Sequence, residues 1–296
     1  CPVLNRLDLP AATGQWSPRV WWIPTGPLVG FPLHAAGYHF EKRKRTCLDC
    51  VISTYATSLR SITYIRRQQL PQRSVRDLVL VAMENTPGQK SLANAEKEVA
   101  AVKEFSGSLQ VNSQYPRRQK GEVQKALENC TIFHFAGHGS THPSQPMRSH
   151  LLLEDHETNP LTVESLLDMK LHRLGPFLAY LSACGTSQSL DDGSLDESIH
   201  LSSACQLAGF RHVIGTLWSV DDRECVDMAR SIYSNLVEQG LQDRSVSYSL
   251  HVASRALRDK WVEERMKEMS VSRNAKATKE QQSVRPLWVP YVHYGV

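Results

Sequence analysis

Short apolar runs, each bounded by polar or glycine-containing stretches, recur along the 296 residues of this chain. The runs that predict strands are 51–55, 77–82, 131–136, 177–182 and 212–217. Several of them are almost continuously apolar, without the alternation expected of a strand with one face in water. Such runs are typical of strands buried on both faces of a parallel sheet.

Amphipathic segments lie between the apolar runs. Those that predict helices are 94–105, 121–129, 164–169, about 198–208, and 222–238. Alternation of strands and helices favours an α/β sandwich, with a mostly parallel sheet covered by helices on both faces.

The rest of the chain follows no clear period. The first 40 residues are rich in Pro, Gly and Trp and predict an irregular lead-in that packs on the sheet edge. Residues 263–284 are polar and charged, which predicts a solvated helix end and then a loop, before the apolar tail 286–294 returns to the fold. We therefore expect one domain over 1–296, with lead-in and edge elements in 1–75 and the main core in 76–296.

Composition limits the classes of protein to consider. Apolar residues make up 41% of the chain and charged residues 22%, which is ordinary for a globular protein. No apolar run approaches the roughly 20 residues that span a bilayer, so we expect no membrane partner. Seven cysteines at irregular spacings favour free thiols in a reducing compartment, and hence a cytoplasmic location. The chain opens with Cys1 rather than Met, and we expect it to be a piece of a longer protein.

Two local patterns suggest ligands but lack the context that would support them. The basic run 42–45 has no aromatic interleaving, so a solvated loop is favoured over a nucleic-acid site. Cys47 and Cys50 form a lone CxxC without a second ligand pair, so we predict no zinc site. Nothing else in the sequence indicates a metal or cofactor.

Two apolar blocks stop at a reactive side chain beside glycine. The first ends at His138 and the second at Cys184. Ligands bind at the carboxyl ends of strands in open parallel sheets. A His and a Cys leaving neighbouring strands there could therefore meet.

Acyl transfer by cysteine needs a base for the thiol and donors for the oxyanion. His138 is the candidate base for Cys184, and the N–H groups of Gly139 and Cys184 are the candidate oxyanion donors. Gly137 and Gly139 flank His138 and let the backbone approach a substrate. A free Cys at a strand end is more often a packing residue, however, and a His beside glycine is more often structural. Spacing alone leaves both interpretations open.

A resemblance extends through these same residues. The chain resembles the CHAT domain, a family that belongs with caspases and separases, from about residue 21 to its end, and the closing motif resembles fungal members. The motifs are PTGPLVGFPLHAA (24–36), ANAEKEV (93–99), HFAGHG (134–139), SHLLLED (149–155), LTV (161–163), LSACGT (181–186), AGFRHVIGTLWSVDD (208–222) and PLWVPYVHYG (286–295).

The resemblance implies a caspase-like sandwich that cleaves specific protein targets through a dyad of His138 and Cys184. Family members are commonly joined to helical repeats, often tetratricopeptide, or to a nucleotide-triphosphatase module, which implies regulatory regions upstream in the same protein. His134 lies out of phase with the strand mouth and is interpreted as a structural histidine. Cys205 and Cys225 occupy no motif position and are interpreted as packing thiols.

Asp222 carries two interpretations. It or Asp221 is placed to cap the helix that begins there, because Asp accepts hydrogen bonds from first-turn N–H groups. In separases an Asp in a similar Trp-centred motif receives a basic side chain, which implies that Asp222 lines the pocket for the residue before the cut bond.

Three functions remain in competition. A cysteine endopeptidase is favoured, because both dyad residues and both flanking glycines are present. The alternative is a catalytically silent interaction or scaffold module that keeps the fold. A redox-sensing thiol protein would need a resolving Cys near Cys184, and the sequence has none close by.

Overall fold

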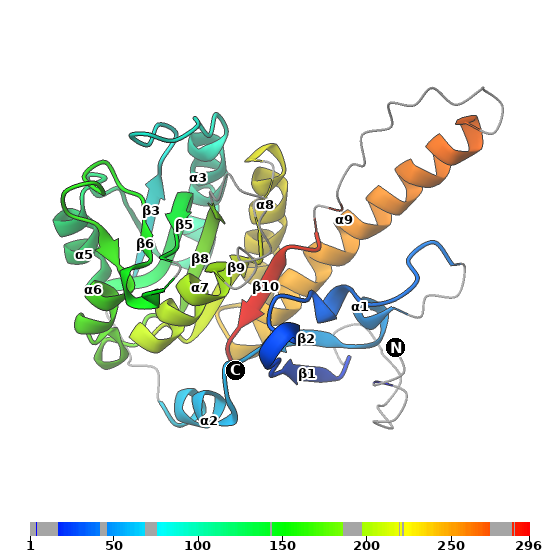
Figure 1. Ribbon diagram of the computed structural model, residues 1–296, viewed down its shortest axis with the longest axis horizontal. Coiled ribbons are helices and arrows are strands. Elements are labelled where there is room, and N and C mark those ends of the chain that lie inside the picture. The colour runs from blue at the N-terminus through cyan, green and yellow to red at the C-terminus, as the bar shows by residue number, and fades with distance from the viewer. Residues whose placement is uncertain are drawn as a thin grey trace.

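The computed structural model describes residues 4, 17–41, 46–68, 76–142, 144–185, 197–218, 220, 222–272, 286 and 288–296. Within these residues a mixed, mostly parallel sheet has the strand order β1-β2-β10-β9-β8-β5-β3-β4, with β6 paired to β5 and β7 to β6 (Figure 1). The strands are β1 Arg19–Trp22, β2 Ile52–Tyr55, β3 Asp77–Ala82, β4 Asn112–Gln114, β5 Cys130–Ser140, β6 His150–Leu151, β7 Leu161–Thr162, β8 Leu178–Gly185, β9 His212–Thr216 and β10 Tyr291–Tyr294.

Helices cover both faces of the sheet (Figure 1). They are α1 Cys47–Cys50, α2 Leu59–Arg67, α3 Ala95–Lys103, α4 Ser106–Leu109, α5 Lys120–Leu127, α6 Val163–Asp168, α7 Glu197–Ala208, α8 Asp222–Gln239 and α9 Asp243–Ser272. Short 3₁₀ turns lie at Gly26–Leu28, Leu33–Ala35, Pro146–Arg148 and Leu171–Arg173. The predicted α/β sandwich, mostly parallel and covered on both faces, is confirmed.

Two apolar cores follow from the alternation of side chains along the strands. Phe133 and Phe135 of β5 belong to the core that packs against α5, α6 and α7. Ile132 and Ala136 of the same strand belong to the core that packs against α3, α8 and α9. Because each central strand is buried on both faces, its sequence shows a continuous apolar run.

Helix α9 is the largest element that the sequence pattern does not indicate. Val246, Leu250 and Ala253 give its first half a buried face. Four serines in the same half of the helix are also buried, and because serine is polar they obscure the apolar pattern of the sequence. They are Ser245, Ser247, Ser249 and Ser254. The second half is mostly exposed and extends beyond the sheet (Figure 1), as the polar stretch from residue 263 predicts. Residues 273–284 of that prediction lie outside the described part of the chain.

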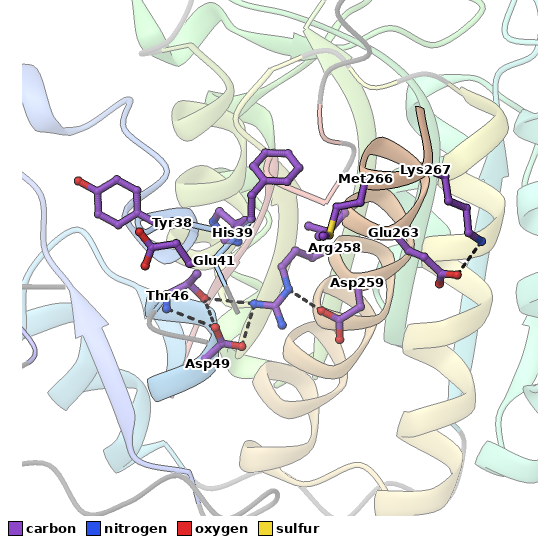
Figure 2. A pocket seen from close by; sticks show the side chains of 12 residues that line it. Tyr38, His39, Glu41, Thr46, Asp49, Arg258, Asp259, Glu263, Met266 and Lys267 are labelled. Carbon is purple, nitrogen blue, oxygen red and sulfur yellow. Dashed lines mark hydrogen bonds and ion pairs between the residues drawn. The ribbon is translucent and has the colours of Figure 1, made fainter. Parts of the chain in front are cut away.

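The lead-in is more regular than predicted and is tied to α9. It supplies the edge strand β1, which pairs with β2 in parallel. Arg258 of α9 forms a buried ion pair with Asp49, with Nη1 2.8 Å from Oδ1, and donates to Thr46 Oγ1 at 3.2 Å (Figure 2). Its Nε donates to Asp259 at 2.8 Å. The Arg258 guanidinium, which joins α9 to Thr46 and to Asp49 of α1, therefore lies beside two carboxylates. Among the described helices none combines the length and apolar character needed to cross a membrane.

Candidate active site

The central strands β5 and β8 are parallel neighbours, and their register pairs His138 with Cys184. The ladder runs without a shift from the pair Ile132 and Leu178 to the pair Gly139 and Gly185. Paired positions of neighbouring strands share one face of a sheet. The backbone therefore places positions 138 and 184 side by side. The side chain of Cys184 lies outside the described part of the structure, so its contact with His138 stays a prediction.

Strand β5 continues four residues beyond the end that the apolar pattern predicts. The short strand β6 pairs with its extension, joining Gly139 to Leu151 and Ser140 to His150. The carbonyl of His138 also accepts a hydrogen bond from the N–H of Leu152 at 2.9 Å. His138 is therefore held inside a ladder rather than in a loop after the strand, and its backbone is fixed from both sides.

The imidazole of His138 is 3% exposed and makes one described hydrogen bond. Its Nε2 lies 2.7 Å from the carbonyl oxygen of Lys90. A carbonyl only accepts, so Nε2 carries the proton and Nδ1 of the neutral ring carries the lone pair. Nδ1 is buried without a hydrogen-bond partner among the described residues. The free nitrogen of the neutral ring is therefore Nδ1, and it is shielded from solvent.

The carbonyl of Lys90 comes from the loop between β3 and α3. That loop is closed by its own backbone, with the N–H of Leu92 donating to Glu84 at 2.9 Å and the N–H of Gln89 to Thr86 at 3.0 Å. Sequence reasoning misses Lys90, because a backbone carbonyl leaves no residue-type signature. Its position depends only on the fold of the loop.

The two glycines beside His138 have different surroundings. A Cβ at Gly137 would lie 2.6 Å from Cζ of Phe135 and 3.0 Å from Cβ of Met83, so this position requires glycine for packing. The sequence interpretation assigned it to substrate approach, and the structure gives it this other reason. Gly139 pairs with Gly185 on one side and with Leu151 on the other.

His134 is a satisfied structural histidine, as the sequence predicts. It is buried, and its Nε2 donates to the Glu98 carboxylate at 3.1 Å while its Nδ1 lies 3.2 Å from the Tyr233 hydroxyl. The ring stacks on Tyr180 with centroids 4.6 Å apart. Both ring nitrogens are therefore engaged within the core.

Four of the five other described cysteines are buried, namely Cys47, Cys130, Cys205 and Cys225, and Cys50 is half-buried. Burial raises the pKa of the Cys205 thiol to about 12 and that of Cys47 to about 11. Cys225 is 3% exposed and lies 3.4 Å from the Tyr291 hydroxyl. The interpretation of Cys205 and Cys225 as packing thiols is confirmed. The described residues hold no group of three or more His, Cys, Asp or Glu that could bind a metal ion.

Asp222 is the first residue of α8, which follows β9 and the half-buried Trp218. That position suits both a helix cap and a pocket residue. The side chain of Asp222 and the whole of Asp221 lie outside the described part of the structure, so neither role is tested.

The strand order and the layers define an α/β sandwich whose central strands pair a His position with a Cys position. More specifically, the chain belongs to the CHAT domain family, whose model matches residues 2–296. No match is found among curated proteins.

Solved structures similar to the chain include a separase–securin complex of Saccharomyces cerevisiae. The TM-score is 0.50 at 14% identity, over 90% of this chain and 15% of that one. The Arg-specific cysteine proteinase gingipain R is similar with a TM-score of 0.49 at 10% identity, over 89% of this chain and 56% of that one. The chain thus spans only part of each, and the likeness to separase concerns the fold.

Proposed function

We propose that this chain is a cysteine endopeptidase domain in which Cys184 is the nucleophile and His138 its acid/base partner. The observation that carries the proposal is the register of β5 and β8, which pairs these two positions. The orientation of His138 adds to it, since the Lys90 carbonyl leaves Nδ1 as the basic nitrogen. Membership of the CHAT family is consistent with this chemistry.

The reaction has two acyl-transfer steps. Nδ1 of His138 takes the proton of the Cys184 thiol, and the thiolate attacks the carbonyl carbon of the substrate. The imidazolium then gives that proton to the leaving amine as the peptide bond breaks, which leaves a thioester. Water, deprotonated by the same nitrogen, attacks the thioester, and the proton returns to the departing thiolate. The hydrogen bond to the Lys90 carbonyl orients the ring throughout.

The proposed oxyanion donors are the N–H groups of Gly139 and Cys184. Both residues lie where the ladder of β5 and β8 ends, so a carbonyl bound at this edge would meet the backbone beyond the last pairs. Donors fixed in advance need no reorganisation when the negative charge develops. Leu151 of the two-residue strand β6 is the neighbour that borders Gly139 on the side away from β8.

The proposal extends to specificity and setting. Asp222 would receive a Lys or Arg side chain before the cut bond, because it follows β9, the strand next to β8. Protein substrates and upstream tetratricopeptide or nucleotide-triphosphatase regions of the same protein are part of the proposal. Five described cysteines are free thiols, which supports a reducing, cytoplasmic compartment. The closing motif supports a fungal member.

The test is covalent labelling with peptidyl electrophiles that carry Arg, Leu or Glu at the position before the reactive group. Mass mapping of the adduct is expected to find one modification at Cys184, with Arg as the preferred residue. Cleavage of matched peptide substrates is expected to follow the same preference. Absence of both adduct and cleavage would favour the scaffold alternative over the peptidase.

A further inference from the structure

Two cavities border α9, and their charges differ. The first, about 560 Å³, contains the Arg258 guanidinium, which Asp49 and Asp259 accompany (Figure 2). The second, about 890 Å³, lies between β1, the end of α2 and the beginning of α9. Three arginines line it, namely Arg19, Arg66 and Arg244, and Asp243 is the one acidic side chain among the described residues around it.

Asp243 is already committed to other partners. Arg211 binds it through two nitrogens, with Nη2 2.7 Å from Oδ2, and His212 Nε2 lies 3.3 Å from Oδ1. The hydrogen bonds of this carboxylate thus go to Arg211 and His212, and it acts on Arg19 only through space. The three arginines line one space, and none of them forms an ion pair with a described side chain.

Arg19 has the least favourable surroundings of the three arginines. Its Nε and Nη2 are shielded from solvent and have no hydrogen-bond partner among the described residues. Burial, with Arg244 and Arg66 close by, lowers its pKa to about 10. Leaving these two donors without acceptors is unfavourable. Nη1 is not shielded in this way, so it is the donor that a ligand in the cavity would meet.

Trp21 holds two of these cations in place. The guanidinium carbons of Arg19 and Arg66 lie 4.6 and 4.8 Å from the centroid of its ring. The indole Nε1 donates to the Gly295 carbonyl at 3.0 Å, which fixes the ring. Stacking orients a guanidinium so that its N–H fork remains available for bidentate binding of an oxyanion.

We propose that this cavity binds a small phosphorylated molecule, whose phosphate oxygens accept from Arg19, Arg66 and Arg244. A multiply charged oxyanion fits three guanidinium groups better than a single carboxylate does. The volume is in the range of small-molecule sites. The beginning of the 30-residue helix α9 adds its positive dipole end to the same space.

The site is separate from the candidate active site. Arg211 and His212 stand at the amino end of β9, which runs parallel to β8. Asp243, which they bind, therefore begins α9 at the edge of the sheet opposite the ends of β5 and β8. A ligand here would contact β1, α2 and α9 and leave His138 untouched.

Calorimetric titration of the chain with pyrophosphate, at constant ionic strength in chloride, tests the proposal. We expect saturable binding, weaker binding of orthophosphate, and a loss of pyrophosphate affinity on the order of 10- to 100-fold in the double variant Arg66→Gln/Arg244→Gln. Both side chains are exposed, so the variant is expected to fold. Arg60→Gln removes one charge from an exposed position on the same helix as Arg66 and is expected to bind pyrophosphate like the wild type.

Three results would overturn the proposal. The first is a lack of saturable pyrophosphate binding by the wild type. The second is an equal loss of affinity in Arg60→Gln, which would indicate diffuse electrostatic attraction. The third is tighter binding of a glutamate-rich or phosphoserine peptide than of pyrophosphate, which would assign the cavity to a partner protein.

Discussion

Two histidines on the same strand, His134 and His138, have opposite surroundings. Both belong to β5, and they pair across the ladder with Tyr180 and Cys184. His134 has both ring nitrogens engaged, by Glu98 and by the Tyr233 hydroxyl. His138 has only Nε2 engaged, and its Nδ1 is buried without a partner among the described residues.

The difference teaches that burial alone does not separate a structural histidine from a candidate base. His134 is 0% exposed and His138 is 3% exposed, so neither differs from a core residue by that measure. The two rings differ in how many nitrogens are hydrogen-bonded, which is two in His134 and one in His138. They also differ in the residue that pairs with them on β8. A spare lone pair beside a Cys position can take a proton, whereas a fully bonded ring is fixed in its role.

The largest expected effect comes from removing the nucleophile. Cys184→Ala should abolish peptide cleavage, a loss on the order of 10⁴-fold or more, because no other group can form the thioester. Cys205→Ala is the matched control. That thiol is buried in α7, so the variant should lose little cleavage activity. Turnover retained in the Cys184 variant, with circular dichroism unchanged, would disprove the assignment of the nucleophile.

The two histidines should fail in different ways when each is replaced by alanine. His138→Ala should lower kcat/KM on the order of 10²- to 10⁴-fold with little loss of stability. His134→Ala should cost about 3–5 kcal/mol of unfolding free energy, because it leaves the Glu98 carboxylate buried without its partner. Urea unfolding and peptide kinetics measure both, and the reversed pattern would refute the comparison.

Asp222→Asn tests whether the site continues into a charged pocket. A charge-assisted hydrogen bond to a basic side chain predicts that kcat/KM for an Arg peptide falls on the order of 10- to 100-fold, while that for a matched Leu peptide is nearly unchanged. Asn caps a helix as well as Asp does. An unchanged ratio of the two constants would therefore leave Asp222 as a cap of α8.

Acidification should destabilise the fold through buried neutral histidines. Burial lowers the pKa of His34 to about 4 and that of His251 to about 4. Their unfolded-state pKa is about 6.5, so the unfolded chain binds more protons as the pH falls below that value. Stability should be full above pH 6.5 and decline towards pH 4, by up to roughly 3 kcal/mol for each group.

His34→Gln provides the matched variant for this pH dependence. His34 Nε2 donates to the Val289 carbonyl at 2.9 Å, and Gln can keep a donor there without titrating. Urea unfolding at several pH values between 7.5 and 4.5 should show a shallower decline in the variant. Parallel pH profiles of variant and wild type would contradict the role of His34.

The sequence predicts the central fold well: the five strands and five helices expected from strong apolar patterns are all present. It misses elements whose signal is local or mixed. Strand β1 is a four-residue run between prolines at 18 and 24, and α9 hides its buried face behind serines. Strands β6 and β7 have two residues each, too few to show a period.

The sequence likewise predicts only part of the candidate sites. His138 is visible in the sequence because it ends an apolar block beside glycine, and His134 is distinguished from it by its place inside the block. The Lys90 carbonyl and the arginines around Trp21 cannot be found that way. The first is a backbone group, and the others come from elements far apart in the chain that only the fold brings together.

The most direct test of the account is the rate at which Cys184 is alkylated by an Arg-bearing peptidyl electrophile in three proteins: wild type, His138→Ala and His134→Ala. If His138 activates the thiol, the second-order rate constant should fall on the order of 10²-fold or more in His138→Ala. It should stay within a few-fold of wild type in His134→Ala under conditions where that variant is folded. Equal rates in wild type and His138→Ala, or an adduct on another cysteine, would contradict the dyad.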